Sequence, residues 1–512
     1  MIYFLTLFWS LKEIQSALFY LHLCQLKEYH LGRFLVHFKT SQGKSLILNK
    51  LILLKIIILF FLLTNFWSGL AIFLLFLLYL VEFLNIAFKI IQDRLIKPVF
   101  TKKVLFLIFV LFLIIFSYLI VLLLSIERIY LPLLIVDILS PILFPLLVFI
   151  LQPLTILERK RILEKATKKR QSCKNLLVIG ITGSYGKTTT KEFLAIILSQ
   201  KFNVLKTQNH KNSEMGISQT ILEELNNDHE IFIGEMAAYN KGGIKLLADI
   251  IHPKIGIITG INEQHLALFG SMENLIQAEG GKELLEYVDI AFFNGNDKLC
   301  QKVYEETKIK KKLCSIKKES DFWISDYKTD LNYIYCTIEN KESINLKIKA
   351  HGVHNLSNLL LAIAVARYLD MDWEEIKKGC LKIDPEMTGI KTYKSKHGFL
   401  IIDSSYSANP TGVLADLKYL SLYSGKKVIV MPCLIELGSA SKKIHEKIGR
   451  KIDEVCDLAI ITTPDNFKDL NSKKAIYVQK PNQIISKLKS FCSGKDTVLI
   501  EGRIKKEIIK KL

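Results

Sequence analysis

The sequence lacks the cysteine patterns that indicate a disulfide framework or a zinc site. Its nine cysteines are odd in number, scattered along 512 residues and never arranged as a C-x-x-C pair, so we expect reduced, mostly buried thiols. Acidic residues are also scarce relative to basic ones. The sequence has 49 aspartates and glutamates against 69 lysines and arginines, which gives a formal net charge of +20. The basic residues gather beside apolar segments, which favours anionic lipid or phosphorylated substrates, and we expect no nucleic-acid partner.

The N-terminus lacks the features of a cleavable signal peptide. Met1 begins an apolar run without a basic segment before it, and no small-residue cleavage site follows. Further apolar runs come after it, each close to the roughly 20 residues that a helix needs to cross a bilayer. They predict a transmembrane region over residues 1–155 with about five helices, at 2–23, 47–66, 68–88, 104–125 and 130–151. The first run is the weakest and could instead lie in the membrane interface.

Basic residues are distributed unevenly around these runs, which predicts the orientation in the membrane. They gather between the first and second runs, between the third and fourth, and after the fifth, whereas the other two turns hold only Arg128. By the positive-inside rule, the N-terminus lies outside an inner (cytoplasmic) multi-pass membrane region and the chain after it lies in the cytoplasm. Residues 156–174 are expected to form a basic, helical linker against the anionic inner leaflet.

The spans show no obviously central charge pair of the kind that marks an ion or proton pathway. Lys55 and Glu82 stand near span ends or could extend to the interface. The sequence therefore gives little support to a transport function.

From Asn175 onward, short apolar runs that end at glycine alternate with helical patterns. Examples are "LLVIGITG", "IFIGEM", "IGIITGI" and "TVLIEG". This alternation predicts an α/β fold with parallel sheets, in which ligands bind at the carboxyl ends of the strands.

The stretch "GITGSYGKTTTKEF" over residues 180–193 lies in that position and has the chemistry of a phosphate-binding loop. The usual G-x-x-x-x-G-K-[ST] spacing fails, because Ile181 stands where the first glycine belongs. Even so, Gly183 and Gly186 allow the backbone to turn its N–H groups toward phosphate, Lys187 can reach the β- and γ-phosphates, and Thr188 can bind Mg²⁺. An ordinary strand-to-helix turn that happens to contain G-K-T is the alternative.

The shorter motif "TGSYGKT" resembles the ATP loop of the Mur ligase family. Further motifs follow in the family's order over about residues 175–512, and together they are specific: "NSEMG", "IGEMAAYNKGGI", "NEQHLALFGS", "HGVHNLSNLLLAIAVA", "DSSYSANP" and "IELGSASKKIHEKIG". The resemblance implies a central ATP-binding P-loop domain over 175–385 and a Rossmann-like C-terminal domain over 386–512. Five membrane spans occupy the place of the family's N-terminal, uridine-nucleotide-binding domain.

The resemblance also implies which residues form the site. It implies catalytic roles for Lys187, Glu235 and His265, and metal contacts from Thr188, Glu235, His265 and Glu279. ATP contacts are implied for Thr182, Gly183, Ser184, Gly186, Lys187, Thr188, Thr189, His354, Asn355, Asn358, Tyr406 and Asn409.

The sequence departs from the family's pattern at three places in the ligase region. Glu279 stands where the family usually has a carbamylated lysine, and its carboxylate supplies the same negative charge, although Lys282 is a competing candidate one helical turn further on. Ser404 replaces the second aspartate of the D-D-S-Y signature. Ile390, followed by Lys391, stands where an arginine is common.

The function implied by the resemblance is ATP- and Mg²⁺-dependent amide ligation through an acyl phosphate. The motifs favour the family branch that joins D-alanyl-D-alanine to a muramyl peptide in peptidoglycan synthesis, with membrane lipid as a further partner. One alternative is a ligase of the same family that joins another amino acid or peptide to a different carboxylate, lipid-linked or not. Another is a membrane receptor or transporter whose P-loop module binds ATP without ligation.

Overall fold

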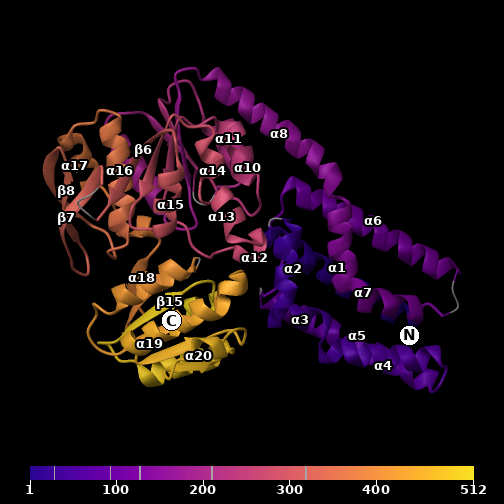
Figure 1. The fold of residues 1–512 in the computed structure, drawn as a ribbon. Helices are drawn as coiled ribbons and strands as arrows, with labels where there is room; N and C mark the ends of the chain where they lie inside the picture. The colour runs from indigo at the N-terminus through magenta and orange to yellow at the C-terminus, as the bar shows by residue number, and fades with distance from the viewer. Residues whose placement is uncertain (28, 93, 126–127, 209–210, 317–319, 407) are drawn as a thin grey trace. The chain divides into compact units, whose positions relative to one another are not determined.

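The computed structural model describes residues 1–27, 29–92, 94–125, 128–208, 211–316, 320–406 and 408–512 (Figure 1). These residues form two compact units, Met1–Lys160 and Arg161–Leu512. The first unit contains the residues of the expected membrane region and the start of the expected linker, and the second contains the residues of the expected ligase domains.

The described part of the first unit is helical. Its helices are α1 (Ile2–Leu26), α2 (Leu31–Lys39), α3 (Ser41–Ile47), α4 (Lys50–Leu63), α5 (Ser68–Ile91), α6 (Lys102–Ser125), α7 (Tyr130–Ile150) and the start of α8 (Gln152–Ser172). Leucine, phenylalanine and tryptophan side chains of α1, α4, α5, α6 and α7 pack into two apolar clusters.

Four helical segments in the described residues are long and apolar enough to cross a membrane: Ser41–Leu63, Ser68–Ile91, Lys102–Leu122 and Tyr130–Ile150. They agree with the second to fifth expected spans. The first expected span forms α1, which is not among the four, because Lys12, Glu13 and Gln15 lower the hydropathy of its centre.

The expectation that no central charge pair exists in this region is wrong. Lys12 of α1 and Lys55 of α4 both pair with Asp137 of α7. The partners stand 125 and 82 residues apart in the sequence, so span-by-span hydropathy could not show that their helix faces meet.

The second unit contains two sheets, each the centre of one α/β domain, and thereby confirms the predicted fold class. The larger sheet has the strand order β2-β3-β1-β4-β5-β6-β7-β8-β9, and the smaller has the order β10-β11-β15-β12-β13-β14. Pairing is parallel except between β7 and β8, between β8 and β9, and between β10 and β11.

The strands of the larger sheet are β1 (Leu177–Thr182), β2 (Val204–Lys206), β3 (Ile231–Glu235), β4 (Ile255–Ile258), β5 (Ile290–Asn294), β6 (Lys310–Ser315), β7 (Phe322–Thr329), β8 (Ile334–Asn340) and β9 (Glu342–Ile348). Those of the smaller sheet are β10 (Lys391–Lys394), β11 (Leu400–Ser404), β12 (Lys427–Met431), β13 (Leu458–Ile461), β14 (Ala475–Tyr477) and β15 (Thr497–Glu501).

Helices cover both faces of each sheet, so the central strands read as continuous apolar runs. The central domain has α9 (Lys187–Leu198), α10 (Glu214–Glu224), α11 (Gly243–Ile251), α12 (Leu266–Phe269), α13 (Met272–Ala278), α14 (Lys282–Leu285), α15 (Lys298–Glu306), α16 (Asn355–Tyr368) and α17 (Trp373–Leu381). The C-terminal domain has α18 (Pro410–Leu420), α19 (Ser441–Val455), α20 (Pro481–Phe491) and α21 (Lys506–Lys511), and short 3₁₀ turns cover Pro385–Thr388, Gly438–Ala440 and Lys468–Leu470.

Candidate active site

The phosphate loop connects β1 to α9, as its sequence predicts. Gly183 and Gly186 have φ values of 139° and 79°, and α9 begins at Lys187. A Cβ atom at Gly183 would lie 2.3 Å from Thr259 Oγ1, and one at Gly186 would lie 2.5 Å from Asn358 Oδ1. Only glycine fits this confined turn, which directs the first N–H groups of α9 into the loop.

Glu235 ends β3, the strand that pairs with β1, so its carboxylate lies next to the phosphate loop. Its Oε1 accepts hydrogen bonds of 3.0 Å from both Thr188 Oγ1 and Asn212 Nδ2. Its Oε2 lies 3.1 Å from Nζ of Lys191, whose side chain is fully buried. Burial alone would raise the pKa of the Glu235 carboxyl, but the charges of Lys191 and Lys187 outweigh burial and hold the pKa below its ordinary value.

These groups fit Mg²⁺ and a nucleotide triphosphate. A threonine hydroxyl and an ionised carboxylate are hard oxygen ligands of the kind that Mg²⁺ prefers beside phosphates. Lys187 adds a positive charge at the loop, where its Nζ donates a hydrogen bond to the Gly183 carbonyl. Thr188 and Glu235 would hold the cation, and Lys187 with the N-terminus of α9 would hold the phosphates.

Glu279 follows α13 and lies at the same loop. Ser184 Oγ donates a hydrogen bond of 2.9 Å to Glu279 Oε2, and Thr182 Oγ1 lies 3.4 Å from the Glu279 backbone carbonyl. The Glu279 side chain is buried. Lys282, the competing residue, instead forms an ion pair of 2.6 Å with Glu306, in which both side chains are well exposed.

His265 meets the C-terminal domain rather than Glu279. Its Nδ1 lies 2.6 Å from Glu436 Oε2, and its ring packs edge-on against Tyr239 at 5.3 Å. His265 and Glu436 both adopt left-handed backbone conformations, with φ values of 66° and 68°. Within the described residues, no group of three or more His, Cys, Asp or Glu side chains is arranged to hold a metal ion, and the metal contacts implied for His265 and Glu279 stay predictions.

The asparagines of α16 support the phosphate loop from the side of α9. Asn358 Oδ1 lies 3.3 Å from Thr190 Oγ1, and Asn358 Nδ2 donates to Asn355 Oδ1 at 3.0 Å. Asn355 Nδ2 donates to the His351 carbonyl at 2.6 Å. His354 precedes the helix with a buried Nδ1 that has no hydrogen-bond partner among the described residues, and burial lowers its pKa.

The two residues expected from the C-terminal domain differ in their positions. Asn409 caps α18 and accepts a hydrogen bond of 3.2 Å from Asn262, in the loop after β4. Tyr406 is half exposed, and its carbonyl accepts a hydrogen bond of 3.3 Å from Arg503. Ser407, in the same signature, lies outside the described residues. Thr189, on the first turn of α9, is partly buried.

Sequence reasoning missed several residues of the site. Lys191 stands four residues after Lys187 on α9, a spacing that could have suggested its common face with the phosphate lysine. Asn262 donates to both Asn409 and Thr411 of the C-terminal domain, and its place at the start of the motif "NEQHLALFGS" could have suggested it.

Ser404, which replaces the second aspartate of the D-D-S-Y signature, contacts a carboxylate of the same domain. Ser404 Oγ donates a hydrogen bond of 2.7 Å to Asp416 Oδ2. The buried carboxyl of Glu501, at the end of the neighbouring strand β15, has its pKa raised well above the ordinary value by burial and by the charge of Asp416. The C-terminal domain thus holds a close carboxyl pair beneath the signature segment.

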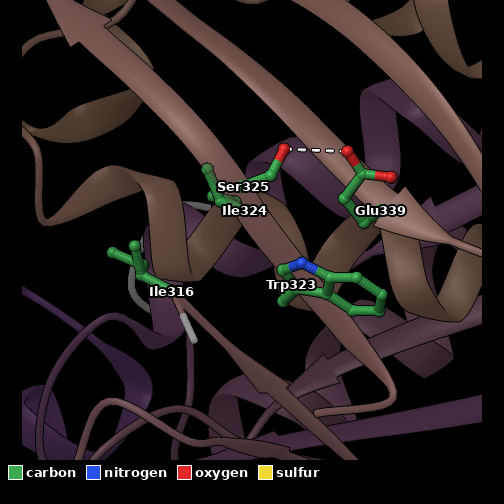
Figure 2. A pocket seen from close by; sticks show the side chains of 5 residues that line it. All are labelled: Ile316, Trp323, Ile324, Ser325 and Glu339. Carbon is green, nitrogen blue, oxygen red and sulfur yellow. Dashed lines mark hydrogen bonds between the residues drawn. The ribbon is translucent and has the colours of Figure 1, made fainter. Parts of the chain in front are cut away.

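A separate pocket of about 390 Å³ lies at the antiparallel end of the larger sheet (Figure 2). Ser325 of β7 and Glu339 of β8 face each other there through a hydrogen bond of 2.8 Å. Its lining residues are Ile316, Trp323, Ile324, Ser325 and Glu339, none of which belongs to the phosphate loop.

Family models for the Mur ligase middle domain and for the Mur ligase, glutamate ligase domain match residues 181–366 and 390–504. Together the two matches cover more than half of the chain, which therefore belongs to the Mur ligase family.

Among curated proteins, the chain is similar to UDP-N-acetylmuramoyl-tripeptide--D-alanyl-D-alanine ligases. It is 33% identical over 286 residues to the protein of Synechocystis, covering 54% of this chain and 59% of that protein. It is 27% identical over 354 residues to the protein of Bacillus subtilis, covering 65% and 75%. The chain thus spans less than two thirds of the length of the Synechocystis ligase.

Solved structures of MurF share the fold. One from Acinetobacter baumannii has a TM-score of 0.63 and 24% identity, covering 69% of this chain and 79% of that chain. The MurF ligase of Thermotoga maritima in complex with ADP has a TM-score of 0.61 and 25% identity, covering 69% and 83%.

Proposed function

We propose that this chain is an ATP-dependent, ADP-forming amide ligase that joins D-alanyl-D-alanine to a muramyl peptide in peptidoglycan precursor synthesis. The observation that carries the proposal is the convergence on one loop of Lys187, the Thr188–Glu235 pair and Glu279. The names of the Synechocystis and B. subtilis relatives supply the substrates.

The residues suit transfer of the γ-phosphoryl group of ATP to a substrate carboxylate. Phosphoryl transfer depends mainly on positioning and on neutralising charge. Mg²⁺ supplies that neutralisation when bound, and Thr188 and Glu235 are the residues that would hold it. Lys187 offsets the charge on the transferring group, and Gly183 and Gly186 allow backbone N–H groups to contact phosphate oxygens.

The second half of the reaction needs no protein nucleophile. The amine of the dipeptide attacks the acyl phosphate carbon, an amide bond forms, and phosphate leaves. The segment around Asn409 and the His265–Glu436 contact lie where the central and C-terminal domains meet. We infer that the dipeptide binds from the C-terminal domain beside these contacts.

We also propose that the first unit anchors the ligase in the cytoplasmic membrane with the ligase domains inside. Support comes from the four apolar helices and from the basic residues at their expected cytoplasmic ends. In this arrangement the muramyl substrate is lipid-linked or delivered at the membrane surface, and the basic linker lies against anionic lipid.

The test uses full-length protein in detergent with ATP and Mg²⁺. UDP-N-acetylmuramoyl-tripeptide and its lipid-linked counterpart are each offered with D-alanyl-D-alanine, with other dipeptides, or with no amine, and ADP release is followed. ADP release that requires D-alanyl-D-alanine supports the proposal. Release with a different amine or acceptor would favour another Mur-type ligase, and ATP binding without amine-dependent release would favour a regulatory P-loop module.

A further inference from the structure

Five charged side chains gather inside the helical first unit, from four different helices. Lys12 Nζ of α1 pairs with Glu13 Oε1 at 2.8 Å and also pairs with Asp137 of α7. Lys55 Nζ of α4 lies 2.8 Å from Asp137 Oδ2 and 2.8 Å from Glu82 Oε1 of α5. We call these five residues the buried charge cluster.

In the membrane arrangement proposed above, on which this inference rests, the cluster lies deep in the apolar layer. With a rise of about 1.5 Å per residue, Lys12, Glu82 and Asp137 each stand about 10–15 Å from the nearer end of their helix. Charged groups at that depth of a bilayer are costly, and those found there usually serve a substrate or ion. Glu13 is 0% exposed and Asp137 is 3% exposed, so neither reaches the interface.

The charges of the cluster do not balance. Three carboxylates face two lysines, so the fully ionised cluster carries one negative charge in excess. Asp137 contacts both lysines and Glu82 contacts Lys55, whereas Glu13 meets Lys12 through Oε1 only. Its other oxygen, Oε2, is buried and has no hydrogen-bond partner among the described residues.

The backbone of α7 also leaves one carbonyl without its helical hydrogen bond. Pro141 stands four residues after Asp137 within α7 and has no N–H to donate to the Asp137 carbonyl. Neighbours of the cluster include two tyrosines, Tyr79 of α5, whose ring lies 5.7 Å from Lys55 Nζ, and Tyr20 of α1, which interacts electrostatically with Lys12 and Glu13. Trp9 of α1 donates from Nε1 to the Leu133 carbonyl at 2.8 Å.

If the cluster served only to hold the helices of the first unit together, equal numbers of lysines and carboxylates would be enough. Two lysines and two carboxylates would serve that purpose, and an additional buried carboxylate with a free oxygen works against it. The excess charge and the free oxygen both call for one positive charge.

We propose that the buried charge cluster is a membrane-embedded site for a single monovalent positive charge, a proton or a small monovalent metal ion, held at Glu13 Oε2. A proton on Glu13 leaves the cluster neutral and gives Oε2 a hydrogen to donate. A monovalent metal ion gives the same balance and would use Glu13 Oε2 as an oxygen ligand. This site is independent of the ligase chemistry proposed for the second unit.

The test is infrared difference spectroscopy of the full-length protein in lipid vesicles, comparing wild type with Glu13→Gln. A carboxylic-acid band of wild type that fades as pH rises, and that is absent from Glu13→Gln, identifies the proton. A carboxylate band that shifts on adding Na⁺ or K⁺ at constant pH, again only with Glu13 present, identifies the metal ion. Identical spectra for the two proteins under both treatments would overturn the proposal.

Glu82→Gln is a second test variant. If the cluster were merely structural, this substitution would leave the infrared signal of Glu13 unchanged. It removes one carboxylate and leaves Glu13, Asp137 and both lysines, so the cluster is balanced without a ligand. We expect the Glu13 signal to be lost although Glu13 is present. A Glu13 signal that persists unchanged in this variant would contradict the charge-balance argument.

Discussion

Of the two candidates for the modified position, Glu279 contacts the phosphate loop and Lys282 does not. Glu279 accepts a hydrogen bond from Ser184 of the loop, whereas Lys282 pairs with Glu306 at the surface. We propose that the Glu279 carboxylate replaces the carbamylated lysine of the family. Its negative charge is then permanent, and no carbamate has to form.

Glu279→Gln should therefore reduce turnover about 10²–10³-fold, the range seen when one electrostatic group is removed from an active site. Lys282→Gln should have little effect, and wild-type turnover should not depend on bicarbonate. Steady-state ADP release by both variants, with melting curves to confirm folding, checks this. An inactive Lys282→Gln together with stimulation by bicarbonate would assign the modified position to the lysine.

Glu501 should make the stability of the C-terminal domain depend on pH. Burial and the charge of Asp416 raise its pKa well above the ordinary value of 4.5, so the folded state holds a proton that the unfolded state releases. Below about pH 4.5 its contribution is fully present. As pH rises toward the folded-state pKa, stability falls by about 1.4 kcal/mol per pH unit for this group.

Glu501→Gln imitates the protonated carboxyl, so the variant should not lose folding stability through this residue as pH rises. Wild type and variant should melt at similar temperatures near pH 4.5, and the variant should melt higher at pH 8, as followed by calorimetry. A variant that melts lower than wild type at pH 8 would show that Glu501 is ionised in the folded protein.

At the scale of elements, the strand–loop–helix unit around Lys187 could be predicted from the sequence alone, because its glycines, lysine, threonine and helix start are local signals. The place of Glu235 also follows from the sequence, since parallel strands bring their carboxyl ends to one edge. The contacts of His265 with Glu436 and of Asn262 with Asn409 join segments 171 and 147 residues apart. Sequence periodicity cannot predict contacts between residues so far apart in the chain. The contact between Lys12 and Asp137 could not be predicted for the same reason.

Lys187→Ala should abolish ATP turnover with little change in stability. The side chain lies at the loop rather than in a hydrophobic core, so its removal takes a charge from the phosphates and leaves no cavity. Lys254→Ala, at an exposed lysine that follows α11, is the matched control and should keep full turnover. ADP release and thermal melting of both variants measure the effect. Retained turnover in folded Lys187→Ala would exclude the loop from the mechanism.

At the scale of the whole molecule, the membrane orientation decides whether the ligase domains can meet ATP. Reporter fusions should place residues 24–50, 89–103 and everything after residue 152 in the cytoplasm, because these segments carry the basic residues. A non-cytoplasmic signal from the C-terminal fusion would separate the phosphate loop from its nucleotide and would contradict the proposed arrangement.

The central claim is that this Mur ligase family member forms one amide bond at the expense of one ATP. The most direct test is mass spectrometry of the product formed by the full-length protein from a muramyl tripeptide, D-alanyl-D-alanine, ATP and Mg²⁺. We predict a product whose mass is the sum of the two substrates less one water, formed in equal amount to ADP and absent with Lys187→Ala. ADP release without that product, or at the same rate without the dipeptide, would contradict the account.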